Sequence, residues 1–344
     1  MKIIKLILKI IGAGITAFVI VSILLIGYGF YLPHVSNPDG NTDFKWVGDS
    51  FFVNGYEGYG FGRFDSNGFN NPKYIENPDI VIVGSSHMEA THVRQNQTTA
   101  SKLAKYLEES GKNYSVYNMG VAGHTFSKVC SYLPETFKQF SKPPKYLIIE
   151  TENTTITPAD ADAIVNHKID IQSSSSSKIV RFIQSISTFR ILYSQYKRGL
   201  VDRFMPDSFF ISSSSADEPN ENNEQFLPDI SYEKVMEYIA SFEKTYGTTI
   251  IIFYHPTEVI SSDGVVSFPN KISTTPFNES AANNDIDFLN MKDSFVEMYN
   301  NEHKLPHGFI TGEIGAGHLN SDGHDLIAKK LSEKIDAIEG TNND

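Results

Sequence analysis

From Asp79 onward, short apolar runs alternate with stretches of helical spacing. Five apolar runs predict strands, at residues 79–83, 114–117, 146–149, 248–254 and 286–289. Between them lie helical patterns such as Thr99–Ser110, which is followed by Gly111, a residue that favours a helix end. Apolar strands that alternate with helices are typical of parallel β–α–β units with helices on both faces. The pattern therefore predicts an α/β fold of three layers around a parallel sheet.

The N-terminal apolar run is longer than any of these strands. Residues 10–33 contain no charge, and this length is enough to cross a hydrocarbon layer of about 30 Å. Cations precede the run, at Lys2, Lys5 and Lys9, and the first acid comes only at Asp39. The positive-inside rule then predicts a single-pass transmembrane anchor with residues 1–9 in the cytoplasm and the main domain extracytoplasmic. A cleaved signal peptide is the alternative, but its apolar region would span only about 7–15 residues.

The other segments divide by composition. Residues 34–78 are rich in Gly, Asn and aromatics without a sustained period, and predict an irregular juxtamembrane segment packed on the domain. The domain then covers 79–338, with a helical insert at about 155–228, and 339–344 form a polar tail. Within the insert, 178–204 combine helical spacing with an excess of cations. This stretch is either a helical insert packed on the domain or a lid or interfacial helix on the anionic membrane surface.

Composition excludes several classes of protein. The net charge of −12 argues against a nucleic-acid partner, because phosphate binding needs a basic surface. A chain with 40% apolar and 20% charged residues is neither disordered nor collagen-like. A single cysteine, Cys130, allows no internal disulfide and no cysteine-based zinc site.

The first candidate for chemistry is Ser86. The apolar strand 79–83 runs into Gly-Ser-Ser-His, which places this serine at the carboxyl end of a parallel strand, where open α/β sheets bind ligands. A helix that starts there would offer free N–H groups to an oxyanion. A tight strand-to-helix turn would explain the same small residues. The literal Gly-Asp-Ser at Gly48–Ser50 lacks both the buried strand and the helix, and we discard it.

Two further residues could stabilise an oxyanion. Gly123 follows the second strand and could bring a backbone N–H close to a reacting carbonyl, because no Cβ blocks the approach. Asn153 follows the third strand and could donate from its side-chain amide. A glycine loop that starts a helix, and an Asx turn at a strand end, are the structural alternatives.

His318 is the candidate general base. It lies in the Gly-rich segment 315–324, just before the amphipathic pattern of the last helix, and imidazole titrates near working pH. A surface loop histidine is the alternative. Metal binding by His318 and His324 lacks an acid or cysteine cluster to complete a site, so we expect no metal and no cofactor.

The order serine, glycine, asparagine and histidine, each after its own strand, resembles the SGNH (GDSL-type) hydrolase superfamily over about 79–336. The resemblance implies a flavodoxin-like α/β/α domain that acts on ester bonds. It implies that Ser86 is the nucleophile and His318 the base. The backbone of Ser86, together with Gly123 and Asn153, would form the oxyanion hole.

The segments Arg63–Phe69 and 318–324 look like the membrane-anchored branch of this superfamily found near bacterial cell-surface polysaccharide systems. That resemblance implies a serine esterase or O-acyltransferase acting on acyl (acetyl) esters of surface glycans. It leaves open whether the chain works with a membrane-bound acyl-transfer partner. The alternatives are a non-catalytic glycan-binding or assembly subunit and, with less support, a structural envelope protein.

The chain departs from the family pattern at the serine, at the acid before the histidine, and at Asn153, which lacks the usual Gly-Asn-Asp setting. The usual Gly-Asp-Ser is Gly84-Ser85-Ser86, and the family's acid, three residues before the histidine, is replaced by Gly315. We therefore expect a Ser86–His318 dyad whose other imidazole nitrogen bonds a backbone carbonyl or water. Glu313 is the alternative acid, if the glycines at 315 and 317 let the loop fold back.

Overall fold

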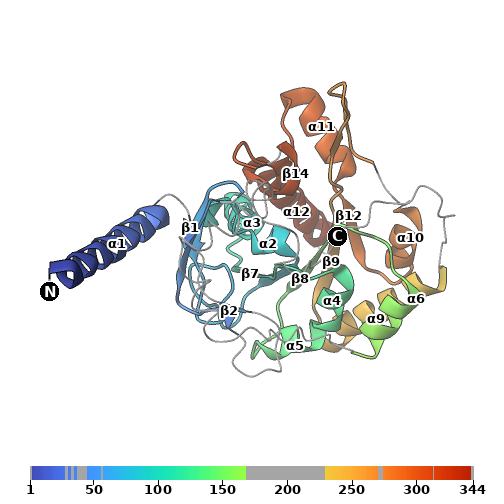
Figure 1. Ribbon diagram of the computed structural model, residues 1–344. Helices are drawn as coiled ribbons and strands as arrows, with labels where there is room; N and C mark the ends of the chain where they lie inside the picture. The colour runs from blue at the N-terminus through green and yellow to red at the C-terminus, as the bar shows by residue number, and fades with distance from the viewer. Residues whose placement is uncertain are drawn as a thin grey trace.

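The computed structural model describes residues 2–27, 30–31, 35–36, 45–55, 57–167, 229–269, 274–312 and 314–341. Helix α1 (Lys2–Gly27) stands out from the rest of the molecule (Figure 1). Within it, Lys2–Leu25 is the one described stretch long and apolar enough to cross a membrane, and none of it is buried against the protein. The helix begins eight residues before the predicted span of 10–33 and ends six residues before the end of that span.

A five-stranded parallel sheet forms the centre of the molecule. Its strands are the five that the apolar runs predict: β6 (Ile80–Gly84), β7 (Val116–Gly120), β8 (Tyr146–Thr151), β9 (Thr249–Tyr254) and β12 (Asp287–Asn290). They lie in the order β12-β9-β8-β6-β7, and every pairing is parallel. The chain therefore starts at β6, adds β7 on one side and then builds outward on the other. This is the flavodoxin-like doubly wound order, whose crevice opens between the first and third strands, here β6 and β8.

Helices cover both faces of the sheet, as Figure 1 shows. On one face, Ile80 and Ile82 of β6 pack in a buried cluster with helices α3 (Thr99–Glu109), α11 (Lys292–Glu302) and α12 (Ser321–Thr341). On the other face, Val81 and Val83 pack against five helices: α4 (Phe126–Ser131), α5 (Leu133–Lys138), α6 (Pro158–Val165), α9 (Asp229–Tyr246) and α10 (Thr275–Asn283). Alternate strand residues point to opposite faces, so one apolar strand contributes side chains to the hydrophobic cores on both faces of the sheet. The predicted three-layer α/β/α class is confirmed.

Helix α3 shows why the local prediction worked. The Thr98 hydroxyl caps its start by accepting a hydrogen bond from the Ser101 N–H at 3.3 Å. Leu103 and Leu107 bury the apolar face. Gly111 has φ +84°, the left-handed conformation that ends a helix and favours glycine.

The predicted insert begins too early. Helix α6 lies inside the predicted range 155–228, yet its Ala161 and Ile164 are buried in the core. A short helix capped by Thr157 and started by Pro158 belongs to the helical layer rather than to an insertion. The remainder of the predicted insert, including the basic stretch 178–204, falls outside the described residues.

The predicted irregular segment 34–78 contains regular structure. Strands β4 (Phe51–Asn54) and β5 (Gly60–Arg63) form an antiparallel hairpin that β1 (Phe30–Tyr31) extends to three strands. A second pair joins β2 (Val35–Ser36) to β3 (Lys45–Trp46). The segment does pack on the domain, because Phe52 and Phe64 are buried and the Tyr117 hydroxyl donates to Asp65 at 2.7 Å. Its glycines hid the strand period from the sequence prediction.

Short elements complete the carboxyl edge of the sheet. Helix α2 (Ser86–Glu89) and the 3₁₀ turn η1 (Gln95–Gln97) follow β6. Strands β10 (Val259–Ile260) and β11 (Val266–Ser267) form one small hairpin, and β13 (His307–Gly308) and β14 (Ile314–Leu319) form another. The last hairpin brings the predicted base, His318, to this edge.

Candidate active site

Ser86 is the first residue of α2, directly after the turn that ends β6. Ser85 is the N-cap, and its hydroxyl accepts a hydrogen bond from the His87 N–H at 3.2 Å. The helix is only four residues long, from Ser86 to Glu89. The predicted helix macrodipole is therefore small here, and any anion stabilisation must come from individual N–H groups.

A buried carboxylate fixes this turn. Glu150, at the end of β8, accepts a hydrogen bond from the Ser85 N–H at 2.6 Å and lies 3.2 Å from the Ser85 hydroxyl. A Cβ at Gly84 would lie 2.5 Å from a Glu150 oxygen, so only glycine lets the strand and the carboxylate approach. The turn is thus held rigidly beside the β6–β8 crevice.

His318 joins Ser86 to a carboxylate that the sequence prediction missed. The Ser86 Oγ lies 3.0 Å from His318 Nε2, and His318 Nδ1 lies 2.7 Å from Glu57 Oε2. The other Glu57 oxygen accepts the His318 backbone N–H at 2.7 Å. A carboxylate on Nδ1 favours the proton there, which leaves the Nε2 lone pair free to accept the serine proton.

The predicted dyad is therefore wrong about the second imidazole nitrogen, which bonds a carboxylate and not a carbonyl or water. The acid comes from the loop between β4 and β5, 261 residues away from His318 in the sequence. Glu313, the alternative acid, lies outside the described residues. Ser86, His318 and Glu57 have the connectivity of a serine–histidine–acid triad.

Glycine on β14 makes room for this acid. Gly317 has φ +81°, and a Cβ there would lie 2.2 Å from Glu57 Oε1. The sequence analysis expected the glycines at 315 and 317 to let the loop fold back toward Glu313, whereas here Gly317 leaves space for Glu57 and Gly315 lies against Ile260.

The electrostatics keep Glu57 ionised. Burial works to raise the pKa of Glu57, but the hydrogen bonds from the ring and backbone N–H of His318 lower it to about 2. His92 stacks on the His318 ring, with the centroids 3.7 Å apart and the planes 16° from parallel. Burial and the neighbouring His318 lower the pKa of His92 to about 3, so His92 is neutral at pH 7. The stacked neutral ring holds His318 in plane without adding charge.

A second buried acid links α2 to the loop that follows β7. Glu89 Oε1 accepts the Trp46 indole N–H at 2.7 Å and the Ala122 N–H at 3.3 Å. Burial raises the pKa of Glu89 to about 7, although both hydrogen bonds act to lower it. Trp46 belongs to the segment before the domain, so Glu89 ties that segment, the turn and the loop together.

The two predicted oxyanion donors lie at the same edge of the sheet, and both also have the structural explanation. Gly123 has φ +81°, which glycine adopts readily, and it precedes helix α4. The Asn153 Oδ1 accepts the Thr155 N–H at 2.9 Å, which is an Asx turn. This turn uses the side-chain carbonyl of Asn153 and not its NH₂ group. Their roles toward an oxyanion stay predictions.

A cavity of about 350 Å³ lies at the β6–β8 crevice, next to Ser86. Eleven residues line it: Ser85, His124, Thr125, Phe126, Ser127, Glu150, Thr151, Glu152, Asn153, Thr155 and Asp160. It therefore includes Asn153 and the sequence neighbours of Ser86 and Gly123, namely Ser85 and His124. Among the described residues, the lining carries hydroxyl and carboxylate groups and includes no Lys or Arg.

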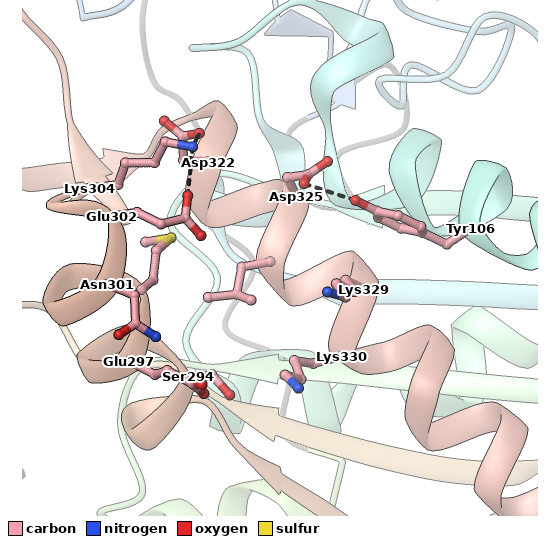
Figure 2. Close-up of a pocket in the computed structure, with 12 residues that line it drawn as sticks. Tyr106, Ser294, Glu297, Asn301, Glu302, Lys304, Asp322, Asp325, Lys329 and Lys330 are labelled. Atoms are coloured by element: carbon pink, nitrogen blue, oxygen red, sulfur yellow. Dashed lines mark hydrogen bonds and ion pairs between the residues drawn. The ribbon is translucent and has the colours of Figure 1, made fainter.

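Another cavity, of about 320 Å³, lies between α11 and α12 and is shown in Figure 2. The polar side chains around it pair with one another: Lys304 lies 2.9 Å from Glu302 and 3.4 Å from Asp322. Neither Ser86, His318 and Glu57 nor their immediate neighbours in the sequence line this cavity, whereas Ser85 lines the first one, so we assign it no part in the chemistry.

The discarded serine and the second histidine have other partners. The Ser50 hydroxyl donates to the Val47 carbonyl within a turn between β3 and β4. His324 is buried on α12, with its Nδ1 2.8 Å from the Thr99 hydroxyl. His318 and His324 thus bond different groups.

The sequence held a signal for Glu57. It is the one acid between Asp49 and Asp65, in a Gly- and aromatic-rich stretch. A lone charge in such a stretch marks a side chain with a specific partner. Glu150 carries a similar signal, as a charged residue within an otherwise apolar strand.

No family model and no curated protein matches this sequence. Among solved structures, it is similar to the esterase EstA from Pseudoalteromonas sp., with 12% identity, a TM-score of 0.38, 77% of this chain covered and 98% of that one. It is similar to an acetyl xylan esterase, AlAXEase, with 12% identity, a TM-score of 0.39, and 74% and 99% covered. A two-domain esterase active on acetylated mannans matches with 11% identity, a TM-score of 0.40, and 76% and 49% covered.

These esterases are the class that the sequence resemblance implied. The shared feature is the α/β fold. At such TM-scores the matches carry no argument about chemistry, which depends on the site itself.

Proposed function

We propose that this chain is an SGNH-type serine esterase or O-acyltransferase that acts on acyl esters of cell-surface glycans. One observation carries the proposal: the Ser86 hydroxyl, the His318 ring and the Glu57 carboxylate form a continuous chain at 3.0 and 2.7 Å. Those distances suit proton transfer from the serine to the imidazole.

In the proposed mechanism, Ser86 Oγ attacks the ester carbonyl while His318 Nε2 takes the serine proton. Glu57 keeps its negative charge and stabilises the imidazolium that forms. The carbonyl oxygen becomes a tetrahedral oxyanion, for which the N–H groups of Ser86 and Gly123 and the Asn153 amide are the proposed donors. The leaving alcohol takes the proton from His318, and an acyl-enzyme remains.

The second half of the reaction releases the acyl group. Water or a sugar hydroxyl gives its proton to His318 and attacks the acyl carbon, and Ser86 regains its proton from His318 as the Oγ–acyl bond breaks. Hydrolysis and transfer therefore share every step except the identity of the acceptor.

The cavity beside Ser86 supports a neutral, hydroxyl-rich substrate. Glu152 and Asp160 are acidic, Thr125 and Thr155 offer hydroxyl groups, and no Lys or Arg is found among the lining residues that the structure describes. Carboxylates accept hydrogen bonds from sugar hydroxyls but repel a phosphate or carboxylate ligand. A glycan with ester groups fits this lining better than an anionic acyl donor.

The placement of the enzyme rests on α1. Its length and hydropathy suit a single-pass anchor, and the lysines at 2, 5 and 9 support a cytoplasmic N-terminus. The site would then act outside the cytoplasmic membrane.

The test uses the full chain in detergent micelles and a small activated acetyl ester. Ser86→Ala should remove the activity and also the labelling by a phosphonate serine probe, because both need the Oγ nucleophile. Ser50→Ala is the matched control and should keep both.

Equal loss in the two variants would mean that the wrong serine has been assigned. Absence of labelling in the unaltered chain would reject the enzyme and favour a glycan-binding protein of the same fold.

A further inference from the structure

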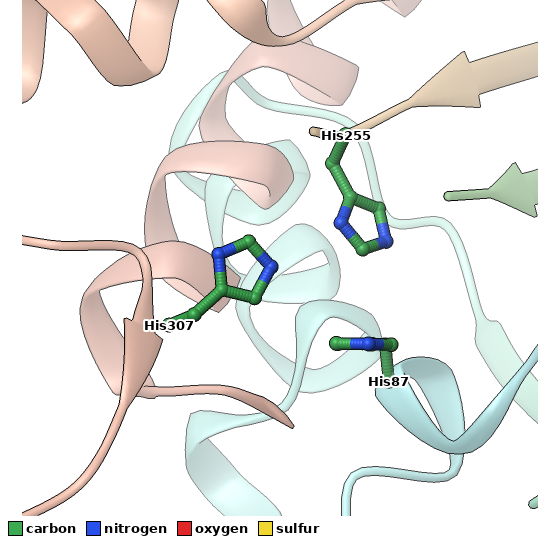
Figure 3. Close-up of side chains that lie close together, drawn as sticks. All are labelled: His87, His255 and His307. Carbon is green, nitrogen blue, oxygen red and sulfur yellow. The ribbon is translucent and has the colours of Figure 1, made fainter. Parts of the chain in front are cut away.

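Three histidines lie together behind the catalytic serine, and the proposed mechanism uses none of them. They are His87 on α2, His255 just after β9 and His307 on β13, and Figure 3 shows their rings around a common space. One ring nitrogen from each lies within 4.8 Å of the others. His255 is 0% exposed and His307 1%.

Each of the two deepest histidines is held by a buried glutamate. His255 Nε2 lies 2.8 Å from Glu150 Oε1, and His307 Nδ1 lies 2.6 Å from Glu258 Oε2. Because an ionised carboxylate only accepts hydrogen bonds, these nitrogens carry the protons. The lone pairs are then on His255 Nδ1 and His307 Nε2.

Within the described part of the chain, those two nitrogens are buried and have no hydrogen-bond partner. A buried acceptor without a donor is destabilising, and an imidazole lone pair is what a transition metal binds.

The charge of the surroundings also calls for a cation. Glu150 and Glu258 are buried carboxylates, and in the described ranges their ion-pair partners are histidines rather than Lys or Arg. Both carboxylates thus lie in the protein interior, each beside one histidine of the cluster. Buried charges are stable when they are paired or near a metal ion.

The third histidine offers its Nε2. His87 Nδ1 accepts the Leu319 backbone N–H at 3.1 Å, and His87 Nε2 lies 3.2 Å from Glu152 Oε2. To bind a metal through Nε2, the neutral His87 ring would carry its proton on Nδ1 instead, and the hydrogen bond from the Leu319 N–H would open. The Glu152 carboxylate would then lie within reach of the metal as a fourth ligand.

We propose that His87, His255 and His307 bind one divalent transition-metal ion, with zinc preferred, in a structural site behind Ser86. Three imidazoles and a carboxylate are a zinc ligand set, and the Glu150 and Glu258 carboxylates on the outer nitrogens orient the rings as in other metal sites. Nitrogens around tetrahedral zinc lie about 3.3 Å apart, so binding would draw the rings inward.

The metal would join three separate elements. It would tie α2, which begins with Ser86, to the end of β9 and to the hairpin that carries His318. It takes no part in the ester chemistry, and its presence can be measured without a substrate.

The test measures zinc on the full chain in detergent, stripped with a chelator, reloaded and desalted. We expect about one zinc per chain and, with cobalt(II), the visible absorption of a four-coordinate ion. His307→Asn should bind at least tenfold more weakly, and Glu258→Gln about 10–100-fold, as for other groups that orient a ligand.

His303→Asn is the matched control, because His303 is exposed, lies four residues from His307 and has φ +54°, which asparagine tolerates. It should bind zinc as the unaltered chain does. Ser86→Ala should also bind normally, so failure of the esterase proposal would leave this one standing.

Two results would overturn the metal site. One is that the unaltered chain retains no zinc and shows no cobalt absorption, which would mean that water fills the space between the histidines. This measurement does not depend on the folding of any variant. The other is equal zinc retention by His307→Asn.

Discussion

At the residue scale, Glu57 determines how His318 can act. The carboxylate accepts both the ring Nδ1–H and the backbone N–H of His318, at 2.7 Å each. It therefore fixes the tautomer and the orientation of the ring with one side chain. The His92 ring, stacked at 3.7 Å, restricts the remaining rotation.

The Glu57→Gln variant should lower kcat by about 10⁴, the loss typical when the acid of a well-built triad is neutralised. His318→Ala should lose the 10²–10⁴ of a general base. Glu313→Gln is the matched control and should stay within about tenfold. All three are measured by hydrolysis of the same activated ester.

A loss below tenfold at Glu57 would restore the dyad that the sequence favoured. Similar losses at Glu57 and Glu313 would mean that the effect is not specific to the His318 contact.

Ser86 and His318 were predictable because each directly follows a recognisable local pattern, an apolar strand or a Gly-rich turn before a helix. Glu57 was not, because its role depends on a contact across 261 residues of sequence. The histidine cluster was missed for the same reason: His87, His255 and His307 come from three elements and meet only in the folded chain.

At the element scale, β14 carries His318 and must also admit Glu57. Gly317 makes both possible, because its φ of +81° turns the strand and its missing Cβ leaves space for the Glu57 carboxylate. The close approach of Glu57 to His318 therefore depends on Gly317 in β14 as well as on Glu57 itself.

Gly317→Ala should lower the ester activity about 10²-fold, the cost of displacing a catalytic group by about 1 Å. Gly264→Ala is the control with the same backbone strain, since its φ is +82° and nothing lies within 4 Å of its Cβ position. Both variants should lose similar stability in thermal unfolding. Equal loss of activity in both would contradict the steric role of Gly317.

The five parallel strands were predictable because strands buried on both faces are continuous apolar runs. The β4–β5 hairpin was not, because glycines at 55, 58, 60 and 62 interrupt its alternation of buried and exposed residues. Helix α6 was assigned to the predicted insert because it is short and precedes the Ser-rich stretch.

At the scale of the whole molecule, α1 and the sheet lie on either side of the segment that holds Glu57 (Figure 1). The lysines at 2, 5 and 9 precede the apolar run, and no cation follows until Lys45. The charges that we expect to orient α1 in a membrane thus lie at the N-terminal end of this helix, whereas the strands and the other helices come after it.

Protease added to spheroplasts with a sealed membrane should digest the large domain, because we expect it to lie outside. A cytoplasmic marker protein should survive the same treatment and serves as the control. Protection of the large domain until detergent is added would reverse the predicted orientation.

The pairing of β1 with β4 sets how far the active site can stand from a bilayer. Phe30 pairs with Asn54 across the two strands. Phe30 comes three residues after the end of α1, and Asn54 comes three residues before Glu57. Two three-residue steps and one strand spacing limit the Glu57 Cα to at most roughly 27 Å from the helix end. With α1 in a membrane, the proposed active site would stay close to the bilayer, and we expect it to reach only glycans that come to the membrane surface.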